Sequence, residues 1–316
     1  MRIAFLDDYQ QVALGLCPLP AGVEAVAFAD HLSDPGQLVA RLAGFDAVVA
    51  MRERTPFPAA VLQRLPDLRL LITTGMRNAS IDVPAAVAAG ITVCGTDSSA
   101  GVSSTNEHTW ALLLALARNI PAQDAAIRAG GWQLGLGTVL AGKTLGLVGL
   151  GRLGAAMVPV ATALGMRITA WSRNLTDERA AEVGVTRLEH GEFFSTADVF
   201  SVHLVLSERS VGTVGAAELA LMKPTALVVN TSRGPIVDER ALLAALTEGR
   251  IGGAALDVYD REPLPLDHPL RRAPNTVLAP HTGYASRESY GGYFSDVADD
   301  VRAFLDGAPV RVLGGA

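Results

Sequence analysis

The sequence predicts an α/β protein built around two doubly wound parallel sheets. Short runs rich in Val, Ile and Leu alternate with helix-like stretches from the N-terminus onward, and the alternation starts again at Thr144 after a glycine-rich stretch, 130–142. Alternation of this kind is typical of βαβ units, which place their strands in parallel sheets. The length of 316 residues is about twice that of an ordinary domain, so we expect two domains.

The first series of elements ends near residue 100. Buried strands are predicted at 2–6, 47–50, 70–73 and 91–94, and the helices between them at 35–42, 59–65 and 83–89. A capping box of Ser104 and Glu107 predicts the start of a helix that continues through the apolar run 110–117. The glycine-rich stretch 130–142 is expected to form a loop or arm.

The second series has six predicted strands, at 145–148, 167–171, 199–203, 227–230, 253–256 and 277–279. Helices are predicted between most of them, notably at 153–164 and 239–248, and a closing helix at 286–305. Six strands in this order fit a doubly wound nucleotide-binding sheet.

Composition excludes several classes of protein. There are 26 Lys and Arg against 32 Asp and Glu, a net charge of −6, which argues against binding to nucleic acid or anionic lipid through a net positive field. The longest apolar run is far shorter than a membrane span of about 20 residues, and the N-terminus lacks the features of a secretory signal. We therefore expect a cytoplasmic protein, with no membrane partner. Cys17 and Cys94 are far apart and are expected to pack as small apolar groups, without a disulfide or a metal.

A glycine fingerprint begins the second series. Gly149, Gly151 and Gly154 form GxGxxG between a predicted strand and a predicted helix, the context of a dinucleotide-binding turn. The predicted helix, 153–164, follows this turn, and the N–H groups and positive dipole end at its N-terminus, near Arg152 and Leu153, would bind a pyrophosphate.

The next strand indicates which nicotinamide cofactor is preferred. An acidic residue would be expected there to bind the adenosine ribose, but the chain has Ser172 and Arg173. Without a carboxylate a 2′-phosphate meets no repulsion, and Arg173 can pair with it. We therefore favour NADP(H), with NAD(H) as the alternative.

Polar residues follow three successive predicted strands at their carboxyl ends, where ligands bind in open α/β sheets. Arg233 can hold the carboxylate of a 2-oxo acid through its planar fork and polarise the adjacent carbonyl. His281 can exchange a proton with the carbonyl oxygen, and Glu262 can orient the imidazole and stabilise its protonated form. Asp257 is placed to bond the nicotinamide carboxamide.

These residues resemble the D-isomer-specific 2-hydroxyacid dehydrogenase family, which includes glyoxylate/hydroxypyruvate reductases and phosphoglycerate dehydrogenases. The segments that carry the resemblance are 142–152, 230–239, 255–259, 262–264 and 280–283. The resemblance implies a catalytic set of Arg233, Glu262 and His281. It also implies a Rossmann-type cofactor domain, 101–284, inserted in a flavodoxin-like split substrate domain made of 1–100 and 285–316.

The resemblance further implies a substrate loop at Thr74, Gly75 and Met76, whose backbone amides would bind the carboxylate, and a homodimer with an arm near 120–142. The loop departs from the family pattern at residues 77–80, so the substrate stays open. Glu262 argues against a formate dehydrogenase, in which Gln would partner the histidine. The length argues against phosphoglycerate dehydrogenases with regulatory extensions.

The sequence thus predicts an oxidoreductase that reduces a small 2-oxo acid such as glyoxylate or hydroxypyruvate. One alternative is an NAD-dependent D-2-hydroxyacid dehydrogenase acting in the oxidative direction. Another, from a different class, is a nucleotide-sensing binding protein similar to the corepressors related to this family.

Overall fold

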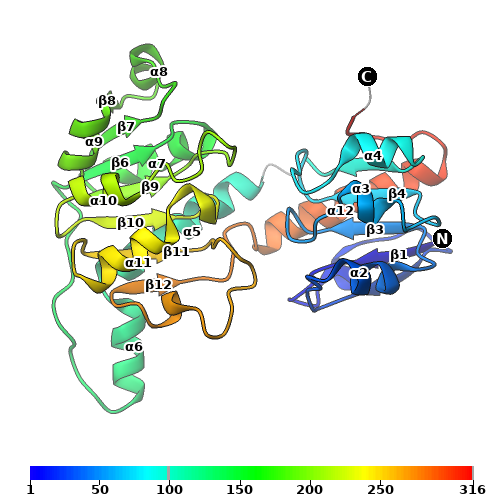
Figure 1. The fold of residues 1–316 in the computed structure, drawn as a ribbon, viewed down its shortest axis with the longest axis horizontal. Coiled ribbons are helices and arrows are strands. Elements are labelled where there is room, and N and C mark those ends of the chain that lie inside the picture. Colours follow the sequence, from blue (N-terminus) through cyan, green and yellow to red (C-terminus); the bar gives the residue numbers. More distant parts are fainter. Residues whose placement is uncertain (98–99, 315–316) are drawn as a thin grey trace. The chain divides into compact units, whose positions relative to one another are not determined.

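The structure is a computed structural model that describes residues 1–97 and 100–314. The chain forms two compact units: unit 1 consists of 1–101 and 285–316, and unit 2 of 102–284. Each unit has its own parallel sheet (Figure 1). The prediction of an α/β protein with two doubly wound parallel sheets is therefore confirmed.

The sheet of unit 1 has five parallel strands in the order β2-β1-β3-β4-β5, which is the flavodoxin-like order. The strands are β1 (Arg2–Phe5), β2 (Glu24–Ala27), β3 (Ala47–Ala50), β4 (Leu70–Thr73) and β5 (Thr92–Gly95). The helices are α1 (Ala13–Leu16), α2 (Pro35–Leu42), α3 (Ala59–Leu62), α4 (Val83–Ala88) and the C-terminal α12 (Arg287–Leu305).

The sheet of unit 2 has seven parallel strands in the order β12-β11-β10-β9-β6-β7-β8, a Rossmann-type arrangement in which β6 and β9 are central. The strands are β6 (Thr144–Val148), β7 (Arg167–Trp171), β8 (Thr186–Arg187), β9 (Val199–Val202), β10 (Leu227–Asn230), β11 (Gly253–Leu256) and β12 (Thr276–Leu278). The helices are α5 (Ala100–Ala117), which begins at the end of unit 1, α6 (Ile120–Arg128), α7 (Arg152–Ala163), α8 (Asp177–Glu182), α9 (His190–Thr196), α10 (Ala216–Leu221) and α11 (Glu239–Thr247). Two short 3-10 helices, η1 (Gly234–Ile236) and η2 (Pro269–Arg272), complete the unit.

The core of unit 2 lies on both faces of its sheet. Val228 and Ala254 belong to one buried cluster, whereas the next residues along the same strands, Val229 and Ala255, belong to another. Successive side chains of a strand point to opposite faces, so both faces are covered. This explains why the central strands are continuous apolar runs that the sequence alone reveals.

The sequence predictions about elements are wrong or incomplete in several places. β2 and β8 were not predicted: β2 has no fully buried residue, and β8 has only two residues. The capping box at Ser104 is wrong: α5 already begins at Ala100, and the Ser104 hydroxyl donates to the carbonyl of Gly283 at 2.9 Å. The helix α6 was also missed.

α6 and the loop that follows it form an arm of unit 2, which we define as residues 119–139. Figure 1 shows α6 standing away from the seven-stranded sheet. The loop is tied back to the helix, since the Gln123 side chain bonds the backbone N–H of Leu134 at 2.9 Å as well as its carbonyl. The predicted loop or arm at 130–142 contains no helix or strand.

Cys17 and Cys94 are buried, as predicted, and are free thiols; burial raises the pKa of each thiol to about 12. Among the described residues, none of the helices combines the length and apolar character needed to cross a bilayer.

Candidate active site

Three neighbouring strands of unit 2 each deliver one of the predicted catalytic side chains. Arg233 follows β10, Glu262 lies in the loop after β11, and His281 follows β12. Because β10, β11 and β12 are adjacent and parallel, their carboxyl ends lie at one edge of the sheet, where ligands of such sheets bind.

The structure brings His281 and Glu262 into direct contact. Nδ1 of the imidazole lies 2.5 Å from Oε2 of Glu262, while Oε1 of the same carboxylate accepts a hydrogen bond from the backbone N–H of Tyr259 at 3.0 Å. Both carboxylate oxygens are therefore engaged, which fixes the side chain that orients the ring. A carboxylate at Nδ1 assigns proton exchange to Nε2 of the imidazole.

His281 also has an unusual backbone. Its φ is 54°, in the left-handed region that non-glycine residues rarely adopt. Such conformations concentrate at functional sites, where the surrounding structure enforces them. Here the surroundings are Asp257 and α5.

Asp257, at the end of β11, holds the loop that carries His281. It is buried, its Oδ1 accepts from the N–H of Thr282 and its Oδ2 from that of Gly283, each at 2.8 Å. His108 of α5 lies 3.1 Å from Oδ1. The carboxylate thus positions the loop after His281, and its predicted bond to a nicotinamide carboxamide stays a prediction.

Arg233 lies in a loop whose backbone is fixed by hydrogen bonds to the side chain of Asn230. The Asn230 side chain donates to the carbonyl of Arg233 at 3.0 Å and accepts from the N–H of Ser232 at 3.0 Å. A Cβ at Gly234 would lie 2.1 Å from the backbone carbon of Tyr259, so only glycine lets the loops of Arg233 and Glu262 pack so closely.

The glycine fingerprint forms a tight turn between β6 and α7. Gly149 has φ of +101°, and a Cβ at Gly154 would lie 2.3 Å from the Gly149 oxygen, so both positions require glycine. Gly151 is the N-cap of α7, and a Cβ there would meet nothing within 4 Å. The helix N-terminus beside Arg152 and Leu153 therefore has no neighbouring atom against Gly151, and binding of a dinucleotide pyrophosphate there stays a prediction.

His203, which the sequence analysis did not single out, follows β9 beside this turn. A Cβ at Gly149 would lie 2.9 Å from its carbonyl oxygen, and its Nε2 lies 2.8 Å from the Ser201 hydroxyl. Burial lowers the pKa of His203 to about 4, so the imidazole is neutral at physiological pH.

The turn after β7 presents the predicted ribose-side residues. Ser172 is half-buried and Arg173 exposed, and the N–H of Leu175 donates to the carbonyl of Ser172 at 3.1 Å, which closes the turn. None of its residues from 172 to 175 is acidic. This chemistry suits a phosphorylated ribose.

In unit 1, the predicted substrate loop follows β4. The N–H of Thr74 donates to the Ala50 carbonyl at 3.1 Å and that of Gly75 to the Thr96 hydroxyl at 2.8 Å. Two of the three amides expected to bind a carboxylate are thus used within the unit itself. Met76 is 38% exposed, and binding of substrate by this loop stays a prediction.

The contribution of α5 to the site was not predicted from the sequence. Besides Ser104 and His108, Thr109 bonds Thr231 of the Arg233 loop through their hydroxyls at 2.7 Å. The helix therefore contacts the loops after β10, β11 and β12. The signal was present in the sequence as a polar stripe, with Ser104 and His108 four residues apart in an apolar helix. No cluster of His, Cys, Asp and Glu suited to a metal ion occurs in the part of the chain that the structure describes.

The sequence and the fold of this chain are similar to those of known proteins. Residues 110–283 match the family model described as "D-isomer specific 2-hydroxyacid dehydrogenase, NAD binding domain". The D-3-phosphoglycerate dehydrogenase of Synechocystis sp. is 36% identical over 312 residues, which cover 98% of this chain and 55% of that protein. The chain spans about half the length of the phosphoglycerate dehydrogenases that it matches.

A glyoxylate reductase of Aeropyrum pernix is 40% identical over 258 residues, covering 78% of this chain and 76% of that protein. Among solved structures, the NADPH-dependent glyoxylate/hydroxypyruvate reductase of Sinorhizobium meliloti, in complex with NADP and malonate, is similar with a TM-score of 0.79 and 26% identity. The match covers 99% of this chain and 96% of that one. Because proteins with both names match, the comparisons do not support setting phosphoglycerate dehydrogenases aside on length.

Proposed function

The chain belongs to the D-isomer specific 2-hydroxyacid dehydrogenase family, and we propose that it reduces a small 2-oxo acid, glyoxylate or hydroxypyruvate, with NADPH. The observation that carries this proposal is the His281–Glu262 pair at 2.5 Å, on the sheet edge that also bears Arg233. An acid/base imidazole, its carboxylate partner and a carboxylate-binding guanidinium are the groups that this reaction requires.

We assign the two units different tasks. Unit 2 would bind the cofactor through Gly149, Gly151 and the N-terminus of α7, and unit 1 would contribute the loop at Thr74, Gly75 and Met76 to substrate binding. When bound, the reduced nicotinamide supplies the hydride. Arg233 would hold the substrate carboxylate and polarise the neighbouring carbonyl. His281 would donate the proton at Nε2 to the carbonyl oxygen, and Glu262 would stabilise the imidazolium before this transfer.

Initial rates with a panel of 2-oxo acids test the proposal. The panel contains glyoxylate, hydroxypyruvate, pyruvate and 3-phosphohydroxypyruvate, each assayed with NADPH and NADH. We expect the highest kcat/KM with glyoxylate or hydroxypyruvate and NADPH. The phosphorylated acid as best substrate would overturn the substrate assignment, and no reduction of any acid with either cofactor would overturn the activity itself.

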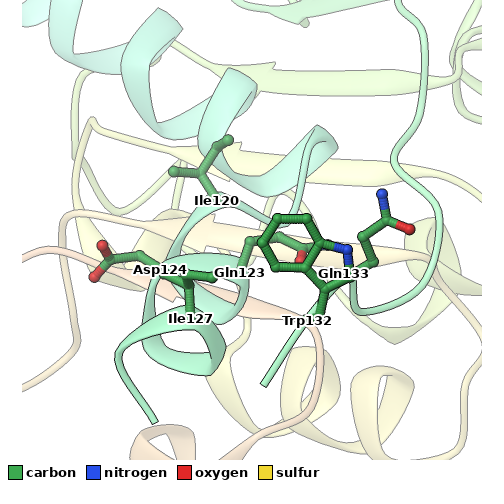
Figure 2. A pocket seen from close by; sticks show the side chains of 6 residues that line it. All are labelled: Ile120, Gln123, Asp124, Ile127, Trp132 and Gln133. Carbon is green, nitrogen blue, oxygen red and sulfur yellow. The ribbon is translucent and has the colours of Figure 1, made fainter. Parts of the chain in front are cut away.

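We also propose that two copies associate through the arm, which exposes several large apolar side chains. Its exposed side chains include Ile120 (55%), Ile127 (51%), Trp132 (75%), Leu136 (96%) and Val139 (67%). Figure 2 shows Trp132 beside α6, where a hollow of about 380 Å³ lies between the helix and the indole. Apolar surface of this kind marks an interaction site.

Light scattering after gel filtration tests this association. The unmodified chain should have twice the mass of one chain, and Ile127→Asp with Trp132→Ser should give single chains. Single chains of the unmodified protein at micromolar concentration would refute the homodimer.

A further inference from the structure

Two turns of unit 2 contact each other across the carboxyl end of β6, the strand that precedes the glycine fingerprint. The turn after β7 places Arg173 and Asn174 at its exposed corners, and a second turn, 207–210, follows β9 and exposes Arg209. Nη2 of Arg209 lies 3.4 Å from Oδ1 of Asn174, a contact between residues that are 35 positions apart.

The strand order gives this contact its significance. β6 lies between β9 and β7 in the sheet, so Arg209 reaches past the carboxyl end of β6, which carries the fingerprint turn. A dinucleotide bound at such a turn has its adenosine ribose at the end of the following strand, which is β7 here. Arg209 therefore approaches the ribose side of the site from the opposite turn.

The charge at this place also points to an anion. In the described ranges, 1–97 and 100–314, neither Arg173 nor Arg209 forms an ion pair with a carboxylate. Arg179, three positions into α8, differs in this respect because it pairs with Glu182 at 2.8 Å. Two arginines without an ion pair, on turns that the contact of Arg209 with Asn174 joins, match a phosphate, which accepts bidentate hydrogen bonds from arginine.

We propose that Arg209 is a specificity-determining residue that binds the 2′-phosphate of NADP(H) together with Arg173, with Asn174 holding the Arg209 side chain toward the site. This inference rests on the proposed use of a nicotinamide cofactor. It adds a residue from the turn after β9 to the ribose-side pair expected from the sequence.

Calorimetric titration of the full chain with 2′,5′-ADP and with 5′-AMP tests the inference without a catalytic readout. The two ligands differ only by the 2′-phosphate. Arg209→Ala should weaken binding of 2′,5′-ADP by about ten- to a hundredfold, the worth of a charge-assisted hydrogen bond, and change binding of 5′-AMP by less than about twofold. Arg209→Lys should fall between the two, because it keeps the charge and loses the fork.

Arg179→Ala is the matched control, since it removes an exposed arginine near the same turn. It should leave both affinities within about twofold of the unmodified chain. Equal weakening of both ligands by Arg209→Ala, or no weakening of either, would overturn the inference, because Arg209 would then shape the adenosine site or take no part in it. Equal affinity of the unmodified chain for both ligands would overturn it as well.

The outcome is separable from that of the proposed function. If no 2-oxo acid is reduced while Arg209→Ala still selectively weakens 2′,5′-ADP, the proposed reaction fails and the phosphate site stands. If 2-oxo acids are reduced and Arg209→Ala leaves the preference for NADPH unchanged, the reaction stands and the phosphate site fails.

Discussion

Nδ1 of His281 lies 2.5 Å from Oε2 of Glu262, and the residue that carries this imidazole has a left-handed backbone with φ of 54°. Both features depend on loops that α5 and Asp257 hold in place. The orientation of the His281 ring therefore depends on the loops that follow several strands. Substitution of each partner residue tests its role.

Replacing His281 by Ala should remove the proton donor and leave the cofactor site intact. We expect kcat for 2-oxo acid reduction to fall by about 10²- to 10⁴-fold, the usual contribution of acid/base catalysis. NADPH affinity, measured by quenching of tryptophan fluorescence, should change by less than about twofold, because the glycine turn lies elsewhere on the sheet edge. Near-normal turnover would end the acid/base assignment.

Glu262→Gln keeps the size of the side chain and removes its charge. The carboxamide no longer holds Nδ1 of His281 through a charged hydrogen bond, so the imidazole is less well positioned for proton transfer. We expect kcat for 2-oxo acid reduction at pH 7.5 to fall about tenfold, with NADPH affinity changed by less than about twofold. Unchanged kcat would show that Glu262 does not position the ring.

Arg233→Ala should affect binding and rate together, since the proposed contact of the guanidinium with the substrate carboxylate would exist in both the ground state and the transition state. We expect KM for glyoxylate to rise and kcat to fall, with kcat/KM lower by about 10³-fold or more. Arg240→Ala, an exposed arginine of α11, serves as the control and should leave both constants unchanged. A rise in KM with unchanged kcat would show that Arg233 binds the ground state and the transition state equally and does not contribute to the chemical step.

His203 should make unit 2 sensitive to acid. Its pKa is lowered to about 4 by burial, so the unfolded chain takes up a proton near pH 6.5 that the folded chain does not. The stabilising contribution is complete above pH 6.5 and is lost as pH falls toward 4, by about 3 kcal/mol. His203→Gln should reduce the difference in unfolding free energy between pH 7.5 and 5, measured in urea. His190→Gln, a half-exposed histidine of α9, should retain most of it.

Asp300 should make unit 1 less stable as pH rises, the opposite of the effect of His203 on unit 2. Burial of this α12 carboxyl raises its pKa to about 7, although Arg311 at 2.9 Å opposes the shift. The folded chain keeps a proton that the unfolded chain releases near pH 4, so stability is lost as pH rises from about 4 to 7, by up to about 4 kcal/mol. Asp300→Asn should flatten the change in melting temperature between pH 5 and 8, whereas exposed Asp299→Asn should not. An equally steep change in Asp300→Asn would refute the assignment.

Some residues of the candidate site were predicted from sequence patterns, and others were not. Arg233, Glu262 and His281 were predicted because each follows a strand with an apolar pattern, and parallel topology brings strand ends to one edge. Ser104, His108, Thr109 and Arg209 were not, because each acts across the sheet edge on a loop far away in the sequence. Their partners are defined only by folding.

The sequence by itself determined the two parallel sheets, the fingerprint turn and the identity of the residues at three strand ends, because apolar periodicity and glycine placement are local signals. Only the tertiary structure decided that Asp257 anchors the His281 loop, that the amides of Thr74 and Gly75 are already donated, and that Arg209 meets Asn174. The physical reason is that a hydrogen bond between distant residues depends on the distance and direction of two atoms, which the order of strands sets and residue type does not.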